Sequence, residues 1–177
     1  MPSGRTHDAI TFLTAVPAFA AAYVVTRSIS AACIVTAAYL FGGLMFGPDL
    51  DTVSVQHSRW SVFRSIWTPY RMFFKHRSRF SHGLIFGALI RVIYFLGVVT
   101  LMAFGGALLY IAVTGGRVPH LFDLARLWQQ VGDYTRTHFG NDFLLLLFLG
   151  LWLGAASHTF TDMAGSFIKT GRLAKFL

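Results

Sequence analysis

Four long hydrophobic runs alternate with polar segments along the chain. They extend over residues 9–25, 29–46, 83–113 and 143–161. A helix that crosses the hydrocarbon core of a bilayer needs about 20 apolar residues, and three of the runs are close to that length. The third run would measure roughly 46 Å as one helix, against a hydrocarbon core of about 30 Å, so only part of it can span.

Arg91 marks where that part begins. A long basic side chain near the end of a span reaches back to the membrane surface, so we expect the third span to cover residues 92–113. The preceding residues then project from the membrane and carry His82 into a polar head made of residues 47–83. The pattern predicts an all-α fold, a single integral-membrane domain in which four transmembrane helices form a bundle beside this head.

Composition and charge agree with a membrane protein. Hydrophobic residues make up 55% of the 177-residue chain and charged residues only 12%, whereas about 25% are charged in an average soluble domain. The net charge of +8 comes from 15 Lys and Arg set against seven acidic residues, all of them Asp. Positive charge is typical of the cytoplasmic loops of membrane proteins, so we expect membrane lipids as partners and no nucleic acid.

Four spans place both termini and residues 47–83 on one side of the membrane. That side carries ten Lys and Arg, whereas the other side, with Arg27 and residues 115–142, carries four. Because cytoplasmic loops retain Lys and Arg, both termini and the polar head are expected in the cytoplasm. On the other side, Leu121 and Trp128 lie at the spacing of a short amphipathic helix.

Within the polar head, aromatic side chains recur at helical spacing among basic ones. Two structures explain this pattern equally well: a helix that lies in the lipid headgroup region, or a short globular helix that covers a site. Pro69 is expected to break either helix into two pieces. The aromatic residues are Trp60, Phe63, Trp67, Tyr70 and Phe74.

Histidine and aspartate residues collect at the cytoplasmic side of all four predicted spans. Imidazole and carboxylate are ligands that Zn²⁺, Mn²⁺ and Fe²⁺ sites use, so a divalent metal is the leading hypothesis, with zinc first. The pairs are His7 and Asp8 before the first span, Asp49 and Asp51 after the second, His76 and His82 before the third, and His158 and Asp162 near the end of the fourth.

The spacing within the pairs indicates how each could act. His158 and Asp162 are four residues apart and share one helix face, as two ligands or a ligand with its orienting partner do. An extended turn after Pro48 would point both following aspartates the same way, although such a turn is also a common cap. His76 and His82 are six residues apart and cannot share a helix face, so the backbone turns between them or they bind different ions.

Motifs in a fixed order relate the chain to a known group. They are Pro48-Asp49-Leu50-Asp51, Ser54, Arg59-Trp60, Trp67-Thr68-Pro69-Tyr70, His76-Arg77, Ser81-His82-Gly83 and His158-x-x-x-Asp162. In this order the chain resembles the prokaryotic predicted membrane-bound metal-dependent hydrolases, and more closely their metal-binding branch that is common in cyanobacteria.

More distantly, the order of motifs is similar to that of the zinc-dependent phospholipase C group. That resemblance implies ligands at His7, Asp49 or Asp51, His76 or His82, His158 and Asp162. The chain departs from the group because it has no Glu and no HxxxHxxxE motif after His158. One or two ions are therefore expected rather than a three-metal cluster.

Two functions are open. As a hydrolase, the chain would use a metal ion to activate water against a phosphoester, for example a phospholipid. Asp8 or Asp51 would then be the general base, and Arg77 or Arg79 would hold the phosphate charge. As a non-catalytic subunit of a larger membrane complex, the chain would bind a structural ion or ligate a haem or chlorophyll. The pairing of histidines with aspartates near the surface favours a metal over such a cofactor.

Overall fold

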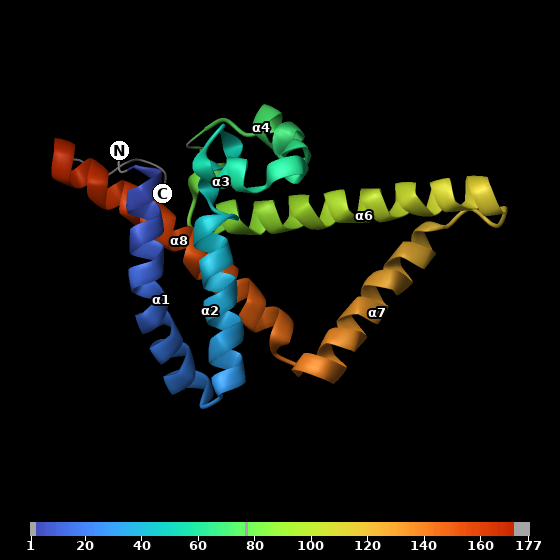
Figure 1. The fold of residues 1–177 in the computed structure, drawn as a ribbon, viewed down its shortest axis with the longest axis horizontal. Helices are drawn as coiled ribbons and strands as arrows, with labels where there is room; N and C mark the ends of the chain where they lie inside the picture. Colours follow the sequence, from blue (N-terminus) through green and yellow to red (C-terminus); the bar gives the residue numbers. More distant parts are fainter. Residues whose placement is uncertain (1–2, 77, 172–177) are drawn as a thin grey trace. The chain divides into compact units, whose positions relative to one another are not determined.

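The computed structural model describes residues 3–76 and 78–171. These residues form α-helices and short 3-10 helices, and no strand occurs among them, which confirms the all-α prediction (Figure 1). The fold divides into two compact units. The first contains the residues up to Arg91 together with those from Leu145 onward, and the second contains Val92–Leu144.

A helical hairpin opens the first unit. α1 (Gly4–Thr26) and α2 (Ile29–Leu44) pack against each other, as the two first hydrophobic runs predict. Arg27 ends α1 in the left-handed conformation, and the Ser28 side chain caps α2 by accepting from the backbone N–H of Ala31. The N-cap of α1 is Ser3, so His7 and Asp8 lie within its first turns and not before the helix as the sequence suggested.

The backbones of α2 and α8 (Phe143–Thr170) come into direct contact in the first unit. A Cβ atom added to Gly42 would overlap the Leu151 carbonyl, and one added to Gly154 would overlap the Tyr39 carbonyl. Only glycine leaves room for helices this close. This close approach fixes where the middle of α8 meets the end of α2.

Short helices follow α2 and are gathered beside its end (Figure 1). They are η1 (Pro48–Asp51), α3 (Val55–Arg59), η2 (Ser61–Trp67), α4 (Thr68–Phe73) and α5 (Arg79–His82). Trp67 and Tyr70 are fully buried, and the Trp67 ring packs edge-to-face on Trp60 at 5.2 Å and on Phe46 at 5.4 Å. This aromatic core favours the globular interpretation of the spacing. Pro69 lies in the first turn of α4, where its missing N–H costs nothing, and the predicted break is found there.

The expectation that Arg91 reaches back to the membrane surface is wrong. α6 runs over Phe86–Thr114, and Arg91 on it is only 2% exposed. Its guanidinium donates to the carbonyl of Phe46 at 3.1 Å through Nε and to the carbonyl of Ser81 at 2.6 Å. A buried cation needs such acceptors, and the turn after α2 and the helix α5 supply them.

The second unit contains the remainder of α6 and α7 (Leu121–Phe139). α7 is the amphipathic helix that the spacing predicts, and its Trp128 donates to Thr100 on α6 at 2.9 Å. No described residue between Val92 and Leu144 is buried.

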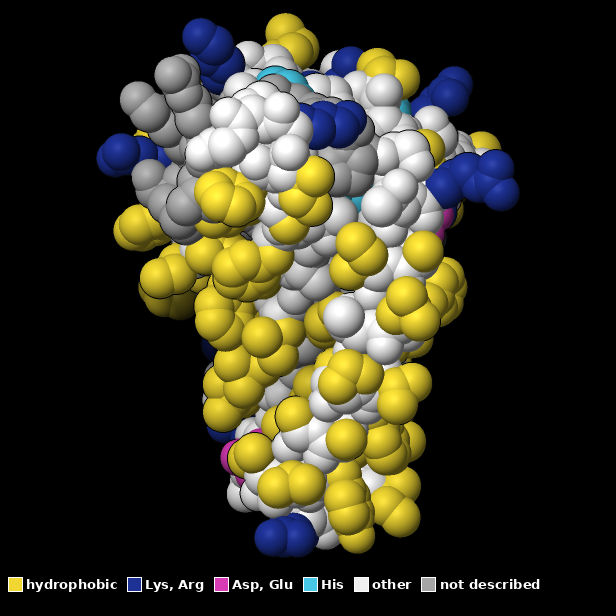
Figure 2. Space-filling model, turned by 90° about the vertical axis from the view of Figure 1, so that its left-hand side faces the viewer, with side chains coloured by type: hydrophobic (Ala, Val, Ile, Leu, Met, Phe, Trp, Pro, Cys, Tyr) yellow, Lys and Arg dark blue, Asp and Glu magenta, His cyan; other side chains and the backbone are white. Residues whose placement is uncertain are grey.

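Four helices in the described part of the chain are long and apolar enough to cross a membrane: α1, α2, α6 and α8. In the view of Figure 2, hydrophobic side chains cover much of the visible face, and Lys, Arg and His side chains gather at its upper end.

Candidate metal centre

The first unit brings all seven sequence-predicted metal ligands together, from segments far apart in the chain. Carboxylates and imidazoles alternate, so that each aspartate lies between two histidines. In spatial order the residues are His7, Asp162, His158, Asp49, His82, Asp51 and His76.

Three of these residues form what we call the closed group: His7, His158 and Asp162. The Nε2 atom of His7 lies 3.3 Å from one Asp162 oxygen, and Nε2 of His158 lies 3.8 Å from the other. The two imidazole rings are stacked, with centroids 3.7 Å apart. All three residues are buried.

Three residues form what we call the open group: Asp49, His76 and His82. The rings of His76 and His82 meet edge-to-face at 5.1 Å, because the chain turns between α4 and α5. The His76 side chain is 40% exposed, whereas that of His82 is fully buried. The turn predicted between the two histidines is therefore confirmed.

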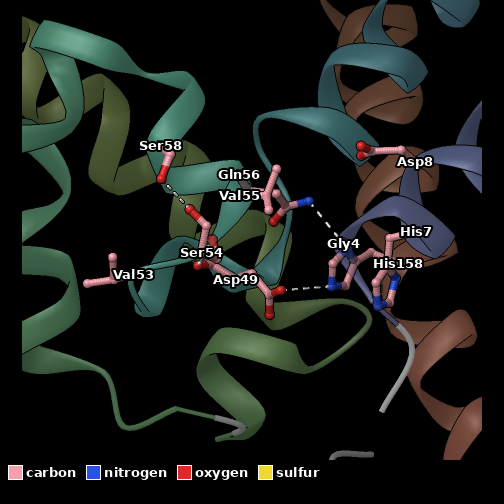
Figure 3. A pocket seen from close by; sticks show the side chains of 10 residues that line it. All are labelled: Gly4, His7, Asp8, Asp49, Val53, Ser54, Val55, Gln56, Ser58 and His158. Carbon is pink, nitrogen blue, oxygen red and sulfur yellow. Dashed lines mark hydrogen bonds and ion pairs between the residues drawn. The ribbon is translucent and has the colours of Figure 1, made fainter.

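Asp49 connects the two groups. Its Oδ1 atom lies 3.6 Å from Nε2 of His82, and its Oδ2 atom lies 3.3 Å from Nε2 of His158. A cavity of about 500 Å³ opens over Asp49 and His158, which face each other in Figure 3. The Asp49 carboxylate is thus both shared by the groups and accessible from the cavity.

Asp51 does not line that cavity. The sequence suggested an extended turn with both aspartates on one side, but Pro48–Asp51 is a 3-10 helix, in which residues two apart face different directions. The buried Asp51 carboxylate lies 2.8 Å from Nδ1 of His76 and 3.4 Å from Nδ1 of His82. It is placed to fix both ring orientations, as carboxylates behind metal-binding histidines do.

The protonation of His82 reflects these neighbours. Burial disfavours its charged form, but hydrogen bonds to Asp49 and Asp51 outweigh burial and raise the pKa of His82. Without a metal, this imidazole therefore holds its proton more tightly than an ordinary histidine.

Two supporting residues were missed by the sequence interpretation. Gln56 is buried and its amide nitrogen lies 2.6 Å from the Gly43 carbonyl and 3.3 Å from Nδ1 of His158, so it holds that ring beside α2. Arg91 ties the segment before Asp49 to the carbonyl of Ser81, the residue before His82. No spacing marks Gln56, and the position of Arg91 in an apolar run suggested another role.

The predicted catalytic residues outside the two groups are arranged differently. Asp8 is held by Arg59, whose guanidinium contacts both carboxylate oxygens and also the carbonyl of Leu44. Arg79 is exposed in the first turn of α5. Arg77 lies outside the described residues.

The donor atoms fit a divalent ion. A tetrahedral ion with ligands about 2.0–2.1 Å away holds its donor atoms roughly 3.3 Å apart, close to the 3.3 Å between His7 and Asp162 and between His158 and Asp49. Among the described residues, Nε2 of His158 and Nδ1 of His7 are buried without a hydrogen-bond partner. Buried polar atoms rarely lack a hydrogen bond, and a divalent ion shared with the nearby Asp49 and Asp162 carboxylates would satisfy Nε2 of His158.

Comparison with known proteins agrees with this fit. Residues 2–172 match the profile of the family described as "Uncharacterized metal-binding protein (DUF2227)". The matched range includes every residue of both groups. No curated protein and no solved structure matches the chain significantly.

Proposed function

The chain belongs to this family of metal-binding proteins, and we propose that it is a membrane-bound hydrolase that uses a pair of divalent metal ions. The observation that carries the proposal is the position of Asp49, whose two oxygens lie beside histidines of different groups and face a cavity. Two-metal hydrolytic sites hold their ions about 3.5–4 Å apart, a distance that one carboxylate can bridge.

Each group would hold one ion. His7, His158 and Asp162 would bind the first, His76 and His82 the second, and Asp49 would be shared. This mixture of imidazole and carboxylate ligands suits Zn²⁺ first, with Mn²⁺ or Fe²⁺ as alternatives. Such ions supply Lewis acidity, which polarises a phosphoryl oxygen and lowers the pKa of water.

The other side chains would prepare the site. Asp51 holds the rings of His76 and His82, so a role as general base would require it to leave them. Asp8 lines the cavity and could accept a proton only when its pair with Arg59 opens. Arg77 or Arg79 would pair with the negative charge of the substrate phosphate.

A phosphoester with an apolar group, such as a phospholipid, is the substrate class that we propose. Val53 and Val55 line the cavity beside Asp49, which supports an amphiphilic ligand. The excess of Lys and Arg on the side of the polar head supports a cytoplasmic position for the site and both termini. A cysteine placed at the exposed Ser65 should then be protected from an impermeant thiol reagent in intact cells.

A second candidate is a non-catalytic metal-binding subunit of a larger membrane complex. The observation in its favour is the burial of His7, His158 and Asp162, because structural metal sites are closed to solvent. In this case the ion would only hold α1 and α8 together.

The test is metal content and turnover of the full chain in lipid nanodiscs. We expect two zinc ions per chain by elemental analysis, loss of both with a strong chelator, and hydrolysis of at least one phosphoester or phospholipid in a panel. Protein without bound divalent metal would refute the proposal. Metal-replete protein that hydrolyses none of the panel would favour the non-catalytic subunit.

A further inference from the structure

The segment Val55–His82, which we call the cap, has two sets of large apolar side chains. The first set is buried around Trp67 and Tyr70 and accounts for the packing of the short helices. The second set points outward from η2, α4 and α5. Its members and their exposed fractions are Val62 at 80%, Phe63 at 60%, Met72 at 81%, Phe73 at 83% and Phe80 at 57%.

The charge of the cap is of one sign. No acidic residue occurs between Asp51 and Asp123, whereas the cap carries six basic ones. Arg59 is paired with Asp8, and Arg64, Lys75 and Arg79 are exposed. Exposed aromatic and aliphatic side chains among unopposed cations are typical of surfaces that bind anionic lipid.

Both ends of the cap are close in sequence to helices that are apolar enough to span a membrane. α2 ends at Leu44, eleven residues before the cap begins at Val55, and α6 begins at Phe86, four residues after the cap ends at His82. With connections this short, the cap cannot move far from the membrane surface.

We propose that the outward side of the cap lies against anionic lipid headgroups, with its exposed apolar side chains in the acyl boundary and its free cations on the lipid phosphates. This inference rests on the membrane insertion within the proposed function and not on its metal chemistry.

The test uses the full chain in nanodiscs with a nitroxide on a single cysteine. Cys33→Ala removes the natural thiol and Phe73→Cys introduces the label site. In nanodiscs of anionic phosphatidylglycerol, we expect collisions with oxygen to exceed those with a water-soluble nickel chelate by about threefold. In purely zwitterionic lipid, or at about 1 M salt, where the Debye length is about 3 Å, the ratio should fall at least about twofold.

Charge variants provide a matched control. The triple change Arg64→Gln, Lys75→Gln and Arg79→Gln should lower the ratio in anionic lipid. Arg117→Gln, Arg126→Gln and Arg136→Gln should leave it unchanged, because those arginines of the second unit are paired with Asp123 or Asp133.

Three outcomes would overturn the inference. A nitroxide that collides readily with the nickel chelate in both lipids would show that the cap lies in water. A nitroxide protected from both oxygen and the nickel chelate would show that a protein partner covers the cap. An oxygen-to-nickel collision ratio that does not depend on lipid charge would show that the cap does not recognise anionic lipid. Retained metal content would show that the variants fold, and Met72→Cys provides a second label position.

Discussion

The closed and open groups use the same side-chain types in different surroundings. In the closed group, α1 and α8 surround the stacked rings of His7 and His158, and all the side chains are buried. In the open group, His76 and Asp49 are partly exposed and belong to short helices and turns. Structural ions sit in closed sites and catalytic ions keep an accessible position. In the proposed two-ion site, the ion of the closed group would therefore hold the helices together and the ion of the open group would activate water.

Their dependence on the fold also differs. The closed group joins α1 and α8, and both helices pack closely on α2, with Thr11 of α1 against Gly43 and Gly154 of α8 against the Tyr39 carbonyl, so its geometry is set before any ion binds. The open group depends on the turn between α4 and α5 and on the contacts that Arg91 makes. We therefore expect the closed group to fill first and more tightly.

The largest effect is expected from Asp49→Ala, because the Asp49 carboxylate lies beside a histidine of each group. Both ions should bind at least about 100-fold more weakly, since each loses a ligand. Competition with a zinc-sensitive dye measures the affinity. Asp133→Ala, which removes an exposed carboxylate on α7, is the control and should change nothing. Unchanged affinity at either group would show that Asp49 is not shared.

The second largest effect is a difference between the two groups in how much a histidine of each contributes to the free energy of unfolding. His158→Ala removes a buried ring from between Asp49 and Asp162, so the metal-free protein should lose about 3 kcal/mol of unfolding free energy. His76→Ala removes a partly exposed ring and should cost less than about 1 kcal/mol. Chemical denaturation of the two variants in detergent compares them. Equal losses would mean that burial does not distinguish the groups.

The third prediction concerns Arg91. Arg91→Met removes the donors to Phe46 and Ser81, and we expect the open group to bind its ion about 10–100-fold more weakly while the closed group is unaffected. Arg79→Met removes an exposed cation three residues before His82 and serves as the matched control. A loss of stability with normal affinity in the folded fraction would contradict a positioning role.

The last effect is a pH dependence of metal binding at the open group. The raised pKa of His82 stabilises the metal-free protein below the ordinary histidine value of 6.5, and this stability is lost as the pH rises through the raised value. A metal must displace this proton, so affinity should fall by about tenfold per pH unit on acidification. Metal titrations and thermal melts between about pH 6 and 8 test both signs. A metal affinity that does not change with pH would contradict the raised pKa of His82.

Hydropathy and side-chain chemistry predict the parts of the molecule that depend on local pattern. The four apolar helices and the amphipathic helix with Trp128 follow from period and length. The convergence of His7, Asp49 and His158 is expected as well, because these residues follow or precede the apolar runs at ends that consecutive antiparallel helices would bring together.

Other features depend on tertiary contacts that no period records. The residues around Arg91 in the sequence are the same whether its side chain reaches solvent or two buried carbonyls. Only the folded positions of Ser81 and Phe46 determine which of the two occurs. The separate directions of Asp49 and Asp51 depend on a 3-10 turn that the sequence does not distinguish from an extended one. The link from Gln56 to His158 joins residues 102 positions apart.

The glycine contact between α2 and α8 has a consequence for ion selectivity. With no side chains to slide or repack at Gly42 and Gly154, the distance between the end of α2, which η1 with Asp49 follows, and the middle of α8, which carries His158, can change little. Ca²⁺ needs oxygen ligands at 2.3–2.6 Å and six to eight of them, whereas Zn²⁺ accepts four ligands near 2.0–2.1 Å. A frame that cannot widen would reject the larger ion by its radius, even though both carry the same charge.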